Sequence, residues 1–153
     1  MRRVFILLSF LVLGLVVTAC DTSTATSPST ATTPGAASIR SAVTSKGYEN
    51  GKAVDPTTTF KTTDIPFHCV VEVGNAPTDT KVKVVWTSVD STDSEGTQYK
   101  DQKIDEKELL TKQTESTVDF TLSNDQPWPV GKYKADIYLD DKLDRTLEFE
   151  VQE

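Results

Sequence analysis

The chain has 153 residues, which is enough for one domain, or for one domain with a tail. Its formal net charge is −7, and it becomes 14 − 23 = −9 without the first 19 residues, which hold two arginines and no acid. Binding to nucleic acid needs a basic face, so this balance excludes a nucleic-acid partner. The presence of only two cysteines and one histidine also excludes a Cys₂His₂ zinc cluster.

The first 20 residues have the features of an exported protein. Arg2 and Arg3 precede an apolar stretch of 14 residues at positions 4–17. A membrane-spanning helix needs about 20 apolar residues, so this stretch is short for a stable crossing. A basic start, a short apolar run and small residues behind it predict a signal peptide over residues 1–19. The alternative is a short anchor helix that is never cleaved.

Residues 17–20, Val-Thr-Ala-Cys, resemble the lipobox of bacterial lipoproteins. The resemblance implies a diacylglyceryl cysteine at Cys20, with palmitate-like chains in the membrane, and cleavage that leaves Cys20 as the first residue. Two long chains hold roughly thirty CH₂ groups, and at about 0.8 kcal/mol each they would anchor the protein by more than about 20 kcal/mol. We therefore expect a lipid-anchored protein on the extracytoplasmic face of a bacterial cell membrane.

Residues 20–37 are expected to form the lipidated cysteine and a disordered linker. Nine of the seventeen residues at 21–37 are serine or threonine, and four are alanine. This composition buries no core, so nothing holds the segment in one conformation. A flexible chain of this length spans about 20–25 Å. An O-glycosylated stalk is the alternative interpretation.

Alternation of apolar and polar side chains with a period of two marks residues 38–153 as a β domain. Five segments show it clearly: 67–73, 81–86, 117–122, 133–139 and 146–151. Weaker strands are expected at 38–46, 59–62 and 97–102, and a helical turn or a loop at 105–112. Seven to eight short strands in one domain of this length predict an all-β, two-sheet antiparallel sandwich.

One face of each predicted strand is apolar and should point into the core. The expected inward side chains are Phe67, Cys69, Val71, Val82, Val84, Trp86, Val118, Phe120, Leu122, Tyr133, Ala135, Ile137, Leu139, Leu147, Phe149 and Val151. Asp140-Asp141-Lys142 is expected to make a tight turn into the last hairpin.

Residues 60–153 resemble immunoglobulin-like or fibronectin-type-III domains. Trp86 falls on the third predicted strand, where those families often bury a tryptophan, and Tyr133 follows Gly131 where a tyrosine often closes a corner. Cys69 has no partner within the domain, so the sandwich would lack the inter-sheet disulfide of antibody domains. The fold alone does not define a function.

A Ser-His-Asp or Cys-His site would have to use His68, the only histidine, and Cys69 is a candidate reactive thiol. They are neighbours on one predicted strand, so their side chains point to opposite faces and cannot pair. We expect His68 on the outer surface and Cys69 in the core, since Phe67 and Val71 share its face. No motif singles out a carboxylate pair for glycoside hydrolysis. We therefore expect a protein that is not an enzyme and needs no cofactor.

An acidic loop is a candidate metal site. Asp90, Asp93 and Glu95 lie within one short loop that ends at Gly96, and clustered oxygens suit calcium. Their spacing does not match an EF-hand, and the alternative is a set of solvated turn residues. A second acidic cluster lies at the last turn: Asp140, Asp141 and Asp144.

Trp128 is the candidate contact for a partner, because Pro127 and Pro129 hold it in a rigid loop. If exposed, its ring is able to stack on a sugar or anchor a protein. If buried, it covers the end of the sandwich. A resemblance to chagasin-like cysteine-protease inhibitors lies in Asp55-Pro56-Thr57-Thr58-Thr59-Phe60 and in Gln126-Pro127-Trp128, although Thr59 replaces a glycine and Gln126 an arginine.

The leading prediction is a membrane-anchored lipoprotein that displays a non-catalytic immunoglobulin-like domain for binding or scaffolding. Its partners would be the membrane, through Cys20, and a protein or the cell wall. The alternative is a module that binds a small ligand, either carbohydrate at Trp128 or calcium at the acidic loops. A chagasin-like inhibitor is the remote alternative.

Overall fold

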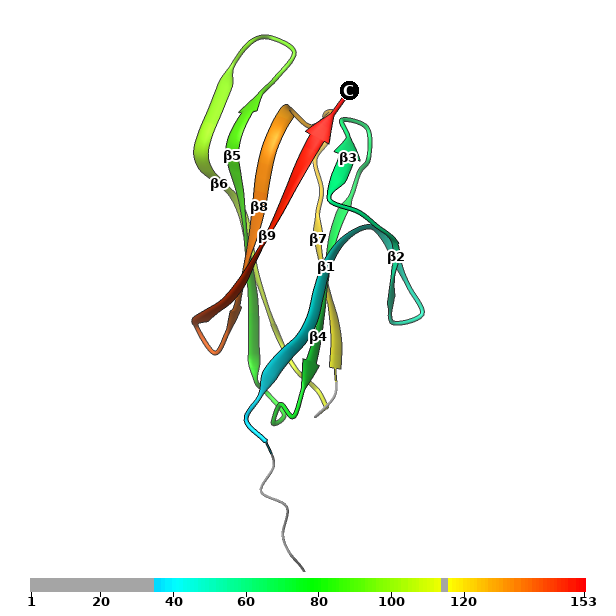
Figure 1. Ribbon diagram of the computed structural model, residues 1–153, viewed down its shortest axis with the longest axis vertical. Helices are drawn as coiled ribbons and strands as arrows, with labels where there is room; N and C mark the ends of the chain where they lie inside the picture. Colours follow the sequence, from blue (N-terminus) through cyan, green and yellow to red (C-terminus); the bar gives the residue numbers. More distant parts are fainter. Residues whose placement is uncertain (1–34, 114–115) are drawn as a thin grey trace, which may run out of the picture. The chain divides into compact units, whose positions relative to one another are not determined.

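The computed structural model describes residues 35–113 and 116–153 (Figure 1). The predicted signal peptide, Cys20 and the predicted linker up to residue 34 lie outside these described residues. The described part consists of strands joined by turns and loops. None of its segments is a helix long and apolar enough to cross a membrane.

Nine strands form two facing sheets. Their bounds are β1 Ser38–Glu49, β2 Lys52–Pro56, β3 Thr59–Lys61, β4 Phe67–Gly74, β5 Lys81–Thr92, β6 Gln98–Leu110, β7 Ser116–Leu122, β8 Val130–Leu139 and β9 Lys142–Gln152. One sheet has the order β2-β1-β4-β7, and the other has the order β3-β9-β8-β5-β6. All neighbouring strands are antiparallel except β3, which runs parallel to β9. The predicted all-β antiparallel sandwich is confirmed.

The core lies between the sheets, where the alternation places it. Of the predicted inward side chains, Val118, Leu139 and Leu147 are partly buried against the core, and all the others are fully buried. Residues outside the predicted set complete the core: Ile39, Phe60, Val73, Ala76 and Trp128. Six aromatic rings form one continuous cluster: Phe60, Phe67, Trp86, Trp128, Tyr133 and Phe149.

The two residues that carried the family resemblance occupy the expected positions. Trp86 is fully buried on β5 and packs edge-on against Phe149, with ring centroids 5.9 Å apart. Tyr133, near the start of β8, donates a hydrogen bond from its hydroxyl to the carbonyl of Pro129 at 2.6 Å. This bond to the backbone four residues upstream closes the corner before β8.

The prediction for residues 105–112 was wrong. These residues continue strand β6 as far as Leu110, and β6 pairs with β5 along its whole length. β6 is the edge strand of its sheet, and its last six residues carry little buried surface on either face. Charged side chains therefore occupy both faces, and no alternation appears in the sequence. Strand β2, which is short and mostly exposed, was not predicted either.

Two irregularities in β5 and β6 change which side chains face the core. The β5–β6 register shifts between Trp86 and Thr87, which leaves Ile104 as an extra residue on β6. The β5–β8 register shifts between Ser88 and Asp90. As a result Ser88 and Ser91 are both buried, while Asp90 lies on the outside. β-Bulges commonly re-aim side chains in this way.

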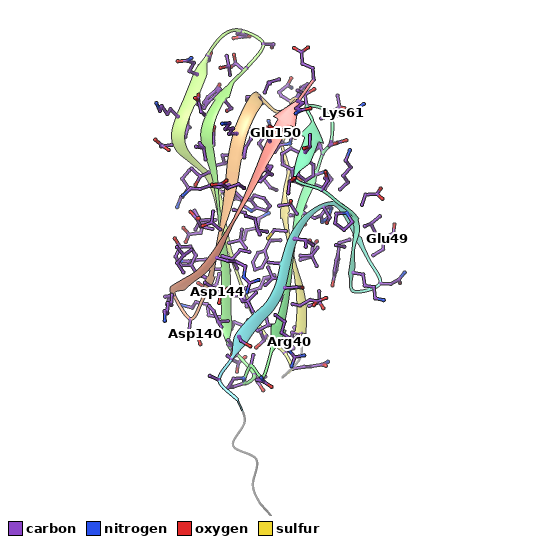
Figure 2. The ribbon with its side chains drawn as sticks, viewed as in Figure 1. Arg40, Glu49, Lys61, Asp140, Asp144 and Glu150 are labelled. Carbon is purple, nitrogen blue, oxygen red and sulfur yellow. The ribbon has the colours of Figure 1, made fainter. Side chains whose placement is uncertain are left out.

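The final hairpin has the predicted tight turn. Asp140 and Asp141 have φ values of 48° and 64°. Positive φ at both central residues is the geometry of a type I′ turn, whose twist matches that of the flanking strands. This turn and the start of β1 lie at the same end of the domain, where Figure 2 labels Asp140 and Arg40.

Candidate functional site

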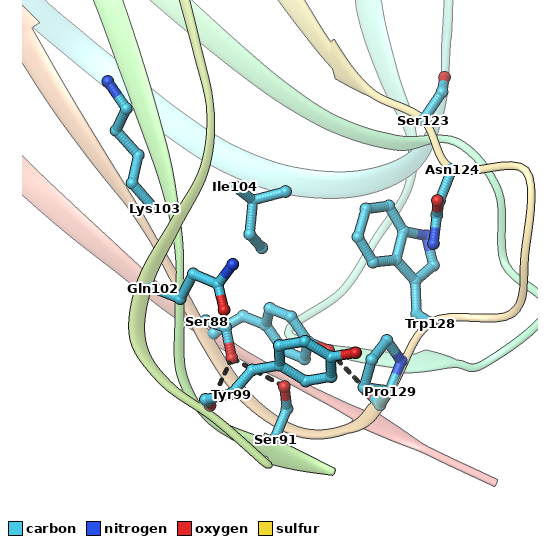
Figure 3. Close-up of a pocket in the computed structure, with 11 residues that line it drawn as sticks. Ser88, Ser91, Tyr99, Gln102, Lys103, Ile104, Ser123, Asn124, Trp128 and Pro129 are labelled. Atoms are coloured by element: carbon cyan, nitrogen blue, oxygen red, sulfur yellow. Dashed lines mark hydrogen bonds between the residues drawn. The ribbon is translucent and has the colours of Figure 1, made fainter. Parts of the chain in front are cut away.

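Two adjoining hollows are lined by residues of the β5–β6 hairpin and of the segment that leads into β8 (Figure 3). This hairpin and the start of β8 lie at the end of the sandwich opposite the start of β1 (Figure 1). The first hollow has a volume of about 310 Å³, and we call it the serine hollow; its lining includes Ser88, Ser91, Tyr99, Gln102, Ile104 and Trp128. The second has a volume of about 630 Å³, and we call it the acidic hollow; its lining includes Thr62, Asp93, Glu95, Tyr99, Gln126 and Glu153. Volumes of about 300–1,000 Å³ are typical of small-molecule sites, so both hollows are large enough for a ligand.

The serine hollow exists because of the two register shifts. One turns both Ser88 and Ser91 inward from β5, and the other inserts Ile104 into β6 beside them. The opposite wall is the segment 123–129 that leads into β8, with Trp128 and Pro129 (Figure 3). One wall of the hollow therefore comes from the shifted part of β5 and β6, and the other comes from the loop at residues 123–129.

Hydrogen bonds hold the walls of the serine hollow in place. The hydroxyls of Ser88 and Ser91 lie 2.7 Å apart, and Ser88 also donates to the carbonyl of Tyr99 at 3.0 Å. The bond from Tyr133 to Pro129 fixes the base of the opposite wall (Figure 3). Burial raises the pKa of the Tyr133 hydroxyl, so this group stays a donor to a higher pH than a solvated tyrosine does. The hollow is thus formed before any ligand arrives.

Tyr99 stands between the two hollows and is held by Asp93. The Tyr99 hydroxyl donates to Asp93 Oδ2 at 2.9 Å. Asp93 Oδ1 accepts from the backbone N–H groups of Thr97 at 2.8 Å and Glu95 at 2.9 Å. The hydrogen bond from the Thr97 backbone is the main reason that the pKa of Asp93 lies below its usual value. The Asp93 carboxylate in turn raises the pKa of Tyr99.

The three candidate calcium ligands are not brought together. Asp90 pairs across the strands with Lys100 and Lys132, and the oxygens of Asp93 are engaged in the hairpin. Among residues 35–113 and 116–153, no group of three or more acidic, histidine or cysteine side chains is arranged to hold a metal. Asp90, Asp93 and Glu95 lie in a turn and on the surface, and calcium binding by them stays a prediction.

The second acidic cluster consists of surface ion pairs and a turn contact. Asp141 lies 3.1 Å from Lys81 Nζ, and Asp144 lies 2.7 Å from Arg145 Nε. Asp140 Oδ1 accepts from the backbone N–H of Lys81 at 3.0 Å. Asp140 and Asp141 close the hairpin onto β5, whereas Asp144 pairs with its neighbour Arg145 on β9.

Trp128 is buried, which overturns its role as an exposed partner contact. Only 5% of its surface is exposed, and its ring stacks on Phe67 at 4.9 Å between centroids. Its backbone N–H donates to the carbonyl of Thr62 at 2.9 Å. Pro127 and Pro129 make the loop rigid, but they do not determine whether the Trp128 side chain points into the core or out to solvent. The alternative is confirmed: Trp128 covers the end of the core and offers no free face for stacking on a sugar.

The chagasin-like resemblance also fails on burial. Its two aromatic residues, Phe60 and Trp128, are 1% and 5% exposed and lie in the same ring cluster. An inhibitory loop has to present its side chains to the protease, so buried rings leave the two segments without the contacts that the resemblance requires.

His68 and Cys69 lie on opposite faces of β4, as predicted. Cys69 is fully buried in the core, and burial, with a smaller effect of Asp119, raises the pKa of its thiol to about 12. His68 Nδ1 lies 3.0 Å from both carboxylate oxygens of Asp119 on the outer face. The hydroxyl of Thr121 donates to Asp119 at 3.2 Å. This His68–Asp119 contact was not predicted, because it joins strands that are 51 residues apart in sequence.

No family model matches the chain, and no curated protein matches it either. An immunoglobulin-like protein from Pseudomonas aeruginosa has a similar structure, with a TM-score of 0.50 and 13% sequence identity over 78% of this chain and 98% of that chain. A mutant β-glucosidase from Listeria innocua in complex with laminaribiose matches with a TM-score of 0.43 and 15% identity, over 77% of this chain and 16% of that chain. The first similarity shows that the chain has an immunoglobulin-like fold.

Proposed function

We propose that this protein is a bacterial envelope lipoprotein, anchored through Cys20, whose immunoglobulin-like domain is a non-catalytic binding or scaffolding module outside the cytoplasm. The observation that carries the proposal is the Val-Thr-Ala-Cys motif at residues 17–20 behind a short apolar run. Two buried acyl chains hold a protein at a membrane far more tightly than one chain does.

The arrangement of the domain supports display away from the membrane. The anchored segment would enter the domain at Ser38, and Ser38 pairs with Gly74 at one end of the sandwich. Strand β5 then runs through 12 residues to the opposite end, which is about 40 Å at the usual rise per residue. The C-terminus and the β5–β6 hairpin lie at that opposite end (Figure 1). Residues of this hairpin line both hollows.

The charge of the chain is compatible with this role. The net charge of −9 outside the first 19 residues repels the anionic surface of a membrane, by at most about 1 kcal/mol for each nearby charge. An anchor of more than about 20 kcal/mol easily exceeds that repulsion. The domain would be held at the membrane by its acyl chains and kept away from the lipid by its charge.

The anchor is tested by replacing its cysteine. Cys20→Ser is expected to move the protein from the membrane fraction to the soluble fraction, or to leave it unprocessed. Cys69→Ala is the matched control, because it replaces the other cysteine of the chain and is expected to leave the protein in the membrane fraction. Mature wild-type protein whose mass includes no lipid would refute the anchor.

A further inference from the structure

We propose that the serine hollow and the acidic hollow together form a binding groove for a neutral oligosaccharide. The proposal rests on the binding role suggested above and specifies its ligand. It does not use Trp128 as a stacking platform. Tyr99 lines both hollows, and its ring is partly exposed.

The charge of the serine hollow favours a neutral ligand. None of its described lining residues carries a carboxylate, so a cationic ligand would find no counter-charge there. Its one cation, Lys103, has its Nζ 3.1 Å from Glu106 Oε2 on the same strand. The neighbouring acidic hollow, with Asp93, Glu95 and Glu153, would repel a polyanion. A ligand that spans both hollows is therefore best uncharged.

The polar groups of the groove match hydroxyl groups. Gln102 and Asn124 carry amides, which offer both donors and acceptors. The buried hydroxyl of Ser88 already donates to the Tyr99 carbonyl and that of Ser91 to Ser88, so they add only acceptor lone pairs. A sugar hydroxyl also donates and accepts. Such a ligand pairs with the two amides without bringing a charge into a partly buried site, which would be costly.

The remaining lining is apolar and rigid. Tyr99, Ile104 and Pro129 present carbon surface, which suits the C–H face of a pyranose ring. Asp93 already fixes the orientation of Tyr99, and Tyr133 fixes Pro129. A preformed site loses less conformational entropy on binding. The two hollows share Tyr99, Asn124, Trp128 and Pro129, so a chain of several sugar rings is able to pass from one to the other.

The experiment is a titration of the ¹⁵N-labelled full chain, in micelles of a detergent without a sugar headgroup. The probes are cellopentaose, maltopentaose and chitopentaose. Trp128 lines both hollows, whereas Trp86 is fully buried in the core, so their two indole N–H resonances serve as reporter and internal reference. At least one pentasaccharide is expected to shift the Trp128 resonance in a saturable way while the Trp86 resonance stays in place.

Two matched variants locate the binding. Ile104→Trp fills the serine hollow from β6, and Ile104 is 37% exposed, so the larger side chain is tolerated by the fold. It is expected to weaken binding by at least about tenfold. Leu110→Trp makes the same change at a residue that is 49% exposed on the same strand but outside both hollows. It is expected to leave the affinity unchanged.

Two results would overturn the proposal. One is the absence of any saturable shift of Trp128 with all three pentasaccharides. The other is an equal loss of affinity in both variants. Since the lipid anchor is tested through the mass of Cys20, failure of the titration leaves the anchor intact, and absence of lipid leaves the oligosaccharide groove intact.

Discussion

Gly131 lies opposite Ser91, a lining residue of the serine hollow, in the pairing of β8 with β5. Its φ of 148° lies in a region that L side chains rarely adopt, and a Cβ there would overlap the carbonyl oxygen of Asp90 and the backbone of Ser91. We expect Gly131→Ala to lower the free energy of unfolding by at least about 2 kcal/mol, because conformational strain and a steric clash add together. Denaturant-induced unfolding measures the change.

Gly51 provides the control for this prediction. It also has a positive φ, of 78°, but no atom lies within 4 Å of the position that a Cβ would take. Gly51→Ala should therefore cost only the backbone preference, about 1 kcal/mol. Equal losses at the two glycines would show that the close approach of β8 to Asp90 has no energetic weight.

The buried thiol of Cys69 makes the stability of the domain depend on pH in the alkaline range. The pKa of this thiol is about 12 in the folded state, where burial disfavours the thiolate, against 9.0 as its ordinary value. Between these two values the folded state holds one proton more than the unfolded state. Stability is therefore complete below about pH 9 and is expected to fall by about 1.4 kcal/mol per pH unit above it.

Cys69→Ala separates this contribution from the titration of tyrosines and lysines over the same range. The variant lacks the thiol, so its stability should decline less steeply between pH 9 and pH 11 than that of the wild type. Cys20 is present in both proteins and cancels in the comparison. The measurement is urea unfolding at a series of pH values, and parallel pH profiles would contradict the assignment.

The β5–β6 hairpin depends on Asp93, whose oxygens accept from Glu95, Thr97 and Tyr99. Asp93→Ala is expected to increase amide hydrogen exchange at Glu95 and Thr97, because both amides lose their acceptor. Ser94→Ala, at an exposed residue of the same turn, is the control and should leave exchange unchanged. The pKa of Asp93 is lowered, so the protection should be present above pH 3.8 and disappear as the pH falls through the lowered value.

The sequence predicted those elements whose two faces differ in environment. Strands such as β4 and β8 place one face in the core, so their residues alternate and their positions are visible. Strand β6 lies at a sheet edge with charged residues on both faces, and its second half carried no such signal. A register shift by one residue leaves no mark in the amino-acid composition of β5 or its neighbours. The sequence therefore did not reveal that Ser88 and Ser91 share a face.

The candidate site was predicted less well than the fold for the same reason. The acidic loop and Trp128 were chosen by residue type, but what these residues can bind depends on where their side chains point. Asp90 points away from the hollow because of a register shift, and Trp128 points inward because Phe67 offers it a ring to stack on. The serine hollow combines residues from four separate segments, between Ser88 and Tyr133. Only the packed sandwich brings these segments together.

At the scale of the described domain, the two ends of the sandwich carry different features. The end with the start of β1 carries the connection to the N-terminal segment and tight turns held by ion pairs, such as the pair of Lys81 and Asp141. The opposite end carries both hollows and is covered by Trp128. The same indole therefore covers the aromatic core and forms a wall of the proposed groove, which links the stability of the domain to its binding site.

Replacing Trp128 tests this link. We expect Trp128→Ala to lower the free energy of unfolding by about 3–5 kcal/mol, because the ring is buried against Phe67 and its removal opens the end of the core. Trp128→Phe keeps a ring on Phe67 and removes an indole N–H that has no hydrogen-bond partner among the described residues. A buried unpaired N–H costs about 1–3 kcal/mol, so this gain offsets part of the lost volume and the phenylalanine variant should lose less than half as much stability. Thermal and urea unfolding of both variants measure the difference. A loss below about 0.5 kcal/mol for Trp128→Ala is typical of a surface residue and would mean that the indole does not cover the core.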